Sequence, residues 1–274
     1  MTNPTIELVL NVSDWFRDNG GSSSYEIHNP IGSRNPVLAR GAFGELSVAI
    51  ATCTSSRRWK LAAVKTIAQF STGGQLLSGR GGWDSCSSET SSTKLSREAY
   101  YEIRALQVLQ THPNIVELLD VYPSKESSMG GKAISLAFPY CPVDLYVTQE
   151  WRRRSFLSVL SFSILRGIAH DIFSALQHCH ANGILHCDIK PGNLLVSSGG
   201  YIQLCDFGLA RPYSTDQKME NIENQEDAKG LCTLYYRPPE LLLGGVAETP
   251  AVDTYSAGLV LAELVTGVPL FRGT

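Results

Sequence analysis

The sequence lacks the features that would direct this protein to an oxidising compartment or into a membrane. Its seven cysteines, at positions 53, 86, 141, 179, 187, 205 and 232, are odd in number and include no CxxC pair. That spacing fits free thiols in a reducing compartment better than disulfides or a zinc site. The chain opens without a basic stretch followed by an apolar run, and its most apolar later stretch, 258–270, is interrupted by Glu263. We expect no secretion, no membrane partner, and a location in the nucleus, the cytoplasm or both.

An excess of positive charge is also missing. The 274 residues carry 23 Lys and Arg against 26 Asp and Glu, which gives a formal net charge of -3. Nucleic acid and anionic membranes both attract proteins with a basic face, so we expect neither as a partner. Apolar residues, in contrast, make up 43% of the chain, which is enough to bury the core of one domain or of two small lobes.

The first 140 residues are dominated by short strand-like runs. These lie at 37–38, 46–52, 61–67 and 134–138, each bounded by turn residues, and they predict a small antiparallel sheet. Within 96–110, Ala99, Ile103 and Leu106 recur at steps of three and four, which predicts one amphipathic helix packed on that sheet. Residues 71–93 are mostly Gly, Ser and Thr, and we interpret them as a flexible insertion.

Beyond residue 140 the pattern is mainly helical. The apolar spacing along 164–180 predicts a helix that Asn182-Gly183 ends. A second predicted helix, about 252–266, is apolar almost all round, as in a helix buried at the centre of a lobe. The predicted fold class is α+β with two lobes. An N-terminal extension covers 1–33, a sheet lobe with one helix covers 34–139, and a mainly helical lobe covers 140–274.

A fixed order of polar residues lies between the two predicted helices. The segment HCDIKPGN at 186–193 is followed by DFG at 206–208. Together they resemble the catalytic loop and the metal-binding triplet of protein kinases. Phosphoryl transfer needs a carboxylate that accepts the proton of the substrate hydroxyl and oxygen ligands for Mg²⁺ bound to ATP. The resemblance implies Asp188 as the base, Asn193 and Asp206 as Mg²⁺ ligands, and Lys190 as the cation beside the transferring phosphoryl group.

The segment AAVK at 62–65 resembles the kinase strand that carries the phosphate-binding lysine. The resemblance therefore implies that Lys65 holds the ATP phosphates. Its carboxylate partner is expected on the helix predicted at 96–110. Glu98 and Glu102 both lie there, one turn apart, and the alignment of the following residues favours Glu102.

The segment ARGAFG at 39–44 resembles the kinase glycine-rich loop, with Ala39 in place of the first glycine. Glycine there lets the backbone approach phosphates. The resemblance further implies that Phe138 gates the space behind adenine, that the backbone of Pro139 and Cys141 binds the base, and that Asp144 binds ribose. The full set that it assigns to ATP is Ala39, Gly41, Gly44, Leu46, Ala63, Lys65, Phe138, Pro139, Cys141, Asp144 and Leu195.

The segment TLYYRPPE at 233–240 resembles the end of the activation segment in the cyclin-dependent and mitogen-activated kinase group. It implies a protein substrate and argues against a metabolite kinase, while Lys190 and Thr233 fit Ser/Thr kinases better than Tyr kinases. Asp253, in the similar segment VDTYSAG, is expected to hold the backbone of the catalytic loop. The alternative is an inactive pseudokinase-type binding module, against which the complete set of catalytic residues argues.

Three departures from the group's pattern bear on regulation. The sequence LSREAYYEIRAL lacks a PSTAIRE-like motif, which argues against a cyclin partner. Of three arginines expected around an activation-segment phosphate, only Arg211 is present, since Tyr101 and Cys187 occupy the other positions and Ala228 occupies the acceptor position. The pattern resembles the monomeric fungal kinases that activate cyclin-dependent kinases, so we expect a monomer acting on proteins such as another kinase.

Kinases have further helices beyond the one at 252–266, so we expect this chain to be C-terminally incomplete and poorly stable.

Overall fold

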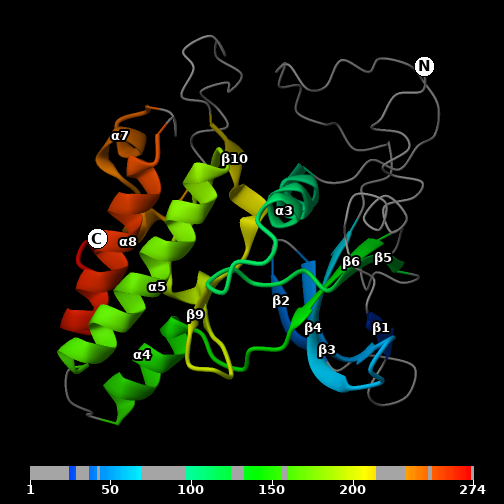
Figure 1. The fold of residues 1–274 in the computed structure, drawn as a ribbon. Helices are drawn as coiled ribbons and strands as arrows, with labels where there is room; N and C mark the ends of the chain where they lie inside the picture. The colour runs from blue at the N-terminus through cyan, green and yellow to red at the C-terminus, as the bar shows by residue number, and fades with distance from the viewer. Residues whose placement is uncertain are drawn as a thin grey trace, which may run out of the picture. The chain divides into compact units, whose positions relative to one another are not determined.

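A computed structural model describes eight stretches of the chain: 25–28, 37–41, 44–68, 97–124, 133–155, 160–213, 232–245 and 249–272. They form two compact units (Figure 1). The described residues up to 140, except 111–116, form the sheet unit, and residues 111–116 with those from 141 onward form the helical unit. The predicted insertion at 71–93 lies outside the described residues. The two units are described separately below.

The sheet unit contains one antiparallel sheet. Its strands are β1 (Tyr25–His28), β2 (Val37–Gly41), β3 (Gly44–Cys53), β4 (Trp59–Ala68), β5 (Asp120–Ser124) and β6 (Ala133–Pro139). They run in the order β1, β3, β4, β6, β5, and β2 pairs with β3 (Figure 1). The four strands predicted from the sequence are confirmed as β2, β3, β4 and β6.

Two strands of the sheet unit, β1 and β5, were not predicted from the sequence. β1 alternates between half-buried and exposed residues over only four positions, yet it pairs with β3 along its length, from Tyr25 opposite Cys53 to His28 opposite Ile50. The sheet therefore extends into the segment that the sequence assigned to an N-terminal extension at 1–33. β5 contains Pro123, which argues against a central strand, and the structure places it at the sheet edge, where a missing N–H is tolerated.

The predicted helix of the sheet unit is confirmed as α3 (Arg97–Val108). Ala99, Ile103 and Leu106 on its apolar stripe are fully buried. One face of the sheet carries a buried cluster of small apolar residues, including Ala49, Ala62 and Val64. The other face of β3, β4 and β6 carries the residues considered below.

The helical unit is built around α5 (Phe162–Ala181) and α8 (Ala251–Thr266), which pack against each other (Figure 1). Both helices predicted from the sequence are thus confirmed. Asn182 is the C-cap of α5, and Gly183 follows with φ 69°, a conformation that suits glycine. Gly267, with φ 80°, caps α8 in the same left-handed conformation.

The remaining elements of the helical unit are short. They are α4 (Leu145–Arg154), α7 (Pro239–Leu242), the paired strands β7 (Ile184–Leu185) and β10 (Arg211–Pro212), the hairpin β8 (Leu194–Val196) and β9 (Ile202–Leu204), and three 3₁₀ turns at Pro191–Asn193, Phe207–Leu209 and Leu234–Tyr236. Among the described helices none has the length and apolar character needed to cross a bilayer.

Eight of the 16 residues of helix α8 are buried. Thr254, Gly258 and Val265 are exposed, so the helix is not buried on all sides as its composition predicts. Three of its buried residues are polar, Asp253, Ser256 and Glu263, and each has a hydrogen-bond partner. One partner is Tyr236, whose hydroxyl donates to Glu263 and whose carbonyl accepts from Ser256. A sequence reading of α8 as simply apolar therefore missed its second role, which is to fix the chain around residues 186 and 236.

Candidate active site

Lys65 and Glu102 form an ion pair inside the sheet unit. The Nζ atom of Lys65, on β4, lies 2.7 Å from Oε2 of Glu102, on α3, and the Glu102 side chain is only 2% exposed. A buried carboxylate is tolerated when an opposite charge and a hydrogen bond reach it. The contact joins the two residues that the sequence analysis paired, while their role in catalysis stays a prediction.

Strand register brings several predicted nucleotide-binding residues onto one face of the sheet. Leu46 on β3 lies opposite Lys65 on β4, and Ala63 on β4 lies opposite Phe138 on β6. Residues directly opposite each other in an antiparallel pair share a face. The face thus presents the Lys65 ammonium beside apolar side chains, which suits a ligand with a phosphate chain and an apolar ring.

The glycine-rich segment forms the β2–β3 pairing. Ala39 lies opposite Leu46, and Gly41 lies opposite Gly44. Gly44 has φ 129°, and a Cβ there would collide with the backbone carbonyl of Thr66. The glycine at position 44 is therefore required by close packing of β3 on β4 as well as by any approach to a phosphate.

The predicted residues beyond β6 belong to two environments. Pro139 ends β6 and lies opposite Ala62 in the sheet unit. In the helical unit, Asp144 forms a bridge with Leu195 and caps α4, its Oδ1 accepting from the Val147 N–H at 2.7 Å. Burial raises the pKa of the Asp144 carboxyl despite that hydrogen bond, and burial also raises the pKa of the Cys141 thiol. The N-cap role of Asp144 was not anticipated from the sequence.

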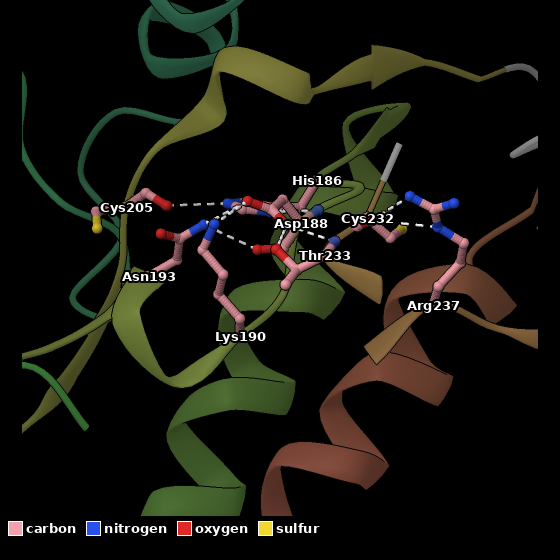
Figure 2. A network of polar contacts seen from close by, with 8 residues as sticks. All are labelled: His186, Asp188, Lys190, Asn193, Cys205, Cys232, Thr233 and Arg237. Atoms are coloured by element: carbon pink, nitrogen blue, oxygen red, sulfur yellow. Dashed lines mark hydrogen bonds and ion pairs between the residues drawn. The ribbon is translucent and has the colours of Figure 1, made fainter. Parts of the chain in front are cut away.

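In the helical unit, the carboxylate of Asp188 is the centre of a polar network (Figure 2). Its Oδ2 lies 2.6 Å from Nζ of Lys190 and accepts from Nδ2 of Asn193 at 3.1 Å. Its Oδ1 accepts from both the backbone N–H of Thr233, at 3.0 Å, and the Thr233 hydroxyl, at 2.7 Å. Asp188 is 5% exposed, so its orientation is set by these partners.

The surroundings of Asp188 keep the carboxyl ionised. Burial alone would raise its pKa, but the hydrogen bond and the charge of Lys190 lower it, and the hydrogen bond from Thr233 lowers it further. The net effect is a pKa below the ordinary value for Asp. A carboxylate that is ionised and oriented can accept a hydrogen bond, and then a proton, from a hydroxyl group.

The backbone beside Asp188 is fixed from α8 by Asp253. The two carboxylate oxygens of Asp253 accept from the N–H groups of His186 and Cys187, each at 2.8 Å. Nε2 of His180 lies 2.9 Å from Oδ2 of the same group. Asp253 has no exposed surface, and its place agrees with the role that the resemblance implies.

Asn193 and Asp206 offer oxygen donors suited to Mg²⁺. The Asn193 amide nitrogen donates to the backbone carbonyl and to Oδ2 of Asp188, which leaves its oxygen facing the other way (Figure 2). Asp206 has the left-handed φ of 64°, and a hydrogen bond from the N–H of Cys205 to the carbonyl of Asn193, at 3.0 Å, links the two segments. An amide oxygen and a carboxylate fit a hard cation that arrives with phosphate oxygens.

Residues 85–274 match the protein kinase domain. The chain belongs to the protein kinase family. The matched range begins after β4 and therefore includes Glu102 but not Lys65. The contact between these two residues extends the likeness to protein kinases to the strand that carries Lys65.

The kinase resembles several curated proteins. It is 33% identical over 183 residues to "Protein kinase gsk31" of Schizosaccharomyces pombe, an alignment that covers 66% of this chain and 46% of that protein. It is 37% identical over 179 residues to "Cell division control protein 2 homolog 3" of Trypanosoma brucei brucei, covering 65% and 52%. It is 38% identical over 172 residues to "CTD kinase subunit alpha" of Schizosaccharomyces pombe, covering 63% and 26%. The chain thus spans about half or less of the length of these relatives.

A further contact of the kinase that was not predicted from the sequence involves Arg237. Arg237 donates from Nε and Nη2 to the backbone carbonyl of Cys232, at 3.2 and 2.8 Å, and Cys232 has the left-handed φ of 60° (Figure 2). The only available signal was the TLYYRPPE segment, which marks the region without revealing which backbone group the arginine holds.

Proposed function

We propose that this kinase transfers the γ-phosphoryl group of ATP to a serine or threonine hydroxyl of a protein. The single observation that carries the proposal is the Asp188 network, in which one ionised carboxylate is oriented by Lys190, Asn193 and Thr233. The presence of a threonine and a lysine at these positions supports a Ser/Thr kinase over a Tyr kinase. Relatives named as cyclin-dependent and glycogen synthase kinases agree with this assignment.

In the proposed mechanism, Asp188 accepts the proton of the substrate hydroxyl as its oxygen bonds to the γ-phosphorus. The bond between that phosphorus and the bridging oxygen breaks, and ADP leaves with the electron pair. Lys190 lies next to Asp188 and offsets charge on the transferring group. Lys65, held by Glu102, binds phosphate oxygens. Mg²⁺ held by Asn193 and Asp206 would supply charge neutralisation on the phosphates.

The decisive experiment is transfer of labelled phosphate from ATP to a protein substrate, compared between the wild type and Asp188→Asn. We expect the variant to lose roughly a hundredfold or more in turnover, since general-base catalysis contributes on that scale. Glu117→Gln is the matched control, because this carboxylate is exposed in the sheet unit and should leave turnover unchanged. A folded wild type that binds ATP without transferring phosphate would favour the pseudokinase-type binding module instead.

We further propose a preference for proline immediately after the target residue. With its carbonyl held by Arg237, Cys232 cannot offer that oxygen to the N–H of the following substrate residue. Proline has no N–H and loses no hydrogen bond there. In a peptide library we expect Ser-Pro and Thr-Pro sites to be favoured about tenfold, which is roughly 1.4 kcal/mol. Equal rates for matched Ser-Pro and Ser-Ala peptides would remove this proposal.

We propose that this kinase is a monomer that acts without a cyclin, in the nucleus or the cytoplasm. Its proposed substrate is a protein, for example another kinase. The support is the sequence of α3, which lacks the motif that cyclins grip. Activity of the purified monomer toward an inactive cyclin-dependent kinase tests the substrate. A stoichiometric cyclin in the active purified complex would contradict the monomer proposal.

A further inference from the structure

Two buried cysteines lie next to each other in the helical unit, each directly before a residue of the Asp188 network. Cys187 precedes Asp188, and Cys232 precedes Thr233. The backbone N–H of Cys232 donates to the carbonyl of Cys187 at 2.9 Å. Neither cysteine is in a disulfide, and the two residues are 0% and 3% exposed in one apolar cluster with Leu185, Leu241 and Val252.

The hydrogen bond limits how far apart the two residues can be. The bonded carbonyl and N–H belong to Cys187 and Cys232 themselves, so standard bond lengths hold their Cα atoms within about 7 Å. Native disulfides join Cα atoms roughly 4.4 to 6.8 Å apart. Both residues also belong to the same buried apolar cluster, so the two thiols share one packed environment.

We propose that Cys187 and Cys232 form a reversible disulfide that ties the catalytic loop to the segment carrying Thr233. The oxidant is a peroxide. One thiol attacks hydrogen peroxide, the O–O bond breaks, and a sulfenic acid and a water molecule form. The second thiol then displaces hydroxide from that sulfur, and its proton completes a second water. The two sulfur atoms together lose two electrons, and a dithiol reductant reverses the change.

The environment of the pair sets its rate. Burial raises the pKa of the Cys232 thiol to about 12, and the charges of Asp253 and Asp188 act in the same direction. Since the thiolate is the reactive form, oxidation proceeds when the segment opens locally, and the closed disulfide is shielded from reductant. The disulfide between Cys187 and Cys232 is therefore expected to form and to be reduced slowly, unlike the disulfides of rapidly exchanging catalytic thiols.

The position of the disulfide gives it a role in activity, and this role rests on the proposed kinase function. A disulfide at 187 and 232 holds Thr233 where its hydroxyl and N–H reach Asp188. It links the catalytic loop covalently to Cys232, the residue before Thr233. The sequence has cysteine, not arginine, at position 187, so no arginine there can hold a phosphate. We expect oxidation to favour the active arrangement.

The test treats the whole 274-residue chain with hydrogen peroxide, then digests it without reduction and maps the linked peptides by mass spectrometry. The expected product joins Cys187 to Cys232 and disappears on treatment with dithiothreitol. The oxidised protein should melt about 5 °C or more above the reduced protein, because the bond closes a long loop. Cys187→Ser and Cys232→Ser should each lose the linked peptide and the melting shift, whereas Cys179→Ser, which removes another buried thiol, should keep both.

Two results would overturn the proposal. One is wild-type protein in which peroxide oxidises Cys53 or Cys141 while Cys187 and Cys232 stay unlinked. The other is a linkage of Cys232 that persists in Cys187→Ser. A second measurement compares the rate of peptide phosphorylation by the oxidised and reduced forms. We expect the rate to be at least twofold higher after oxidation. A lower rate after oxidation would refute the activating role. A linked, stabilised protein with no phosphotransfer in either form would count against the proposed kinase function and leave the disulfide established.

Discussion

The hydroxyl of Thr233 and its backbone N–H both donate to the same oxygen of Asp188, at 2.7 and 3.0 Å. These residues are separated by 45 positions in the chain, and both are held by α8: Asp253 fixes the backbone before Asp188, and Ser256 and Glu263 hold Tyr236 just after Thr233. The proposed base is thus oriented from the activation segment as well as from the catalytic loop. Helix α8 is the common support of both.

Thr233→Ala should lower turnover about tenfold, because it removes a hydrogen bond to a charged group worth roughly 1.5 to 3 kcal/mol while the backbone N–H remains. Thr233→Ser is the matched control, since it keeps the hydroxyl, and we expect it to retain most of the activity. The measurement is steady-state phosphorylation of one peptide by all three proteins. Equal loss in both variants would show that the methyl packing of Thr233, not its hydroxyl, matters.

Lys190→Met should move the acidic limb of the rate profile to higher pH. In the wild type the lowered pKa of Asp188 keeps the base ionised, so activity is present above that pKa and is lost as pH falls through it. Without the hydrogen bond and charge of Lys190, burial dominates and the pKa of Asp188 rises. The measurement is kcat/KM against pH for wild type and variant. A limb that stays in place, with a uniform loss of rate, would assign Lys190 to the transferring phosphoryl group alone.

Glu102→Gln should weaken the hold on Lys65, since the Glu102 carboxylate is buried and lies 2.7 Å from the ammonium. A loss of about 2 kcal/mol of charge-assisted hydrogen bonding corresponds to roughly 30-fold in kcat/KM. Glu98→Gln, one turn earlier on α3, is the control and should retain activity. If the Glu98 variant were the weaker enzyme, the choice of partner for Lys65 in the active protein would be reversed.

Activity should not depend on phosphorylation of the activation segment. Cys187 lies in an apolar cluster where an arginine would be needed to bind a phosphate, and Arg211 is buried with its Nη1 donating to the carbonyl of Ala210. A dianionic phosphate is best held by several charge-assisted contacts, and the sequence supplies few of them here. Phosphatase treatment of active enzyme is therefore expected to leave the rate unchanged. A tenfold fall that rephosphorylation within 212–232 restores would contradict this.

The sequence by itself located the longest elements and the candidate catalytic residues. Periodicity located α3, α5, α8 and four strands, because each buries one face of a regular element. Ordered motifs that resemble those of protein kinases marked Lys65, Asp188, Asn193 and Asp206 as candidates, and phosphoryl transfer explains why side chains of these types are needed. Both kinds of signal are local, and they are readable without knowing how distant segments meet.

Tertiary structure decided what distant segments do to one another. Only the fold shows that Thr233 reaches Asp188, that Arg237 holds the carbonyl of Cys232, and that β1 adds to the sheet. The neighbouring backbones of Cys187 and Cys232 belong to the same class of contact. Each such contact depends on a backbone conformation and a packing partner many residues away. Residue type and spacing along the chain do not specify such contacts, because the same motif can pack against different neighbouring segments in different folds.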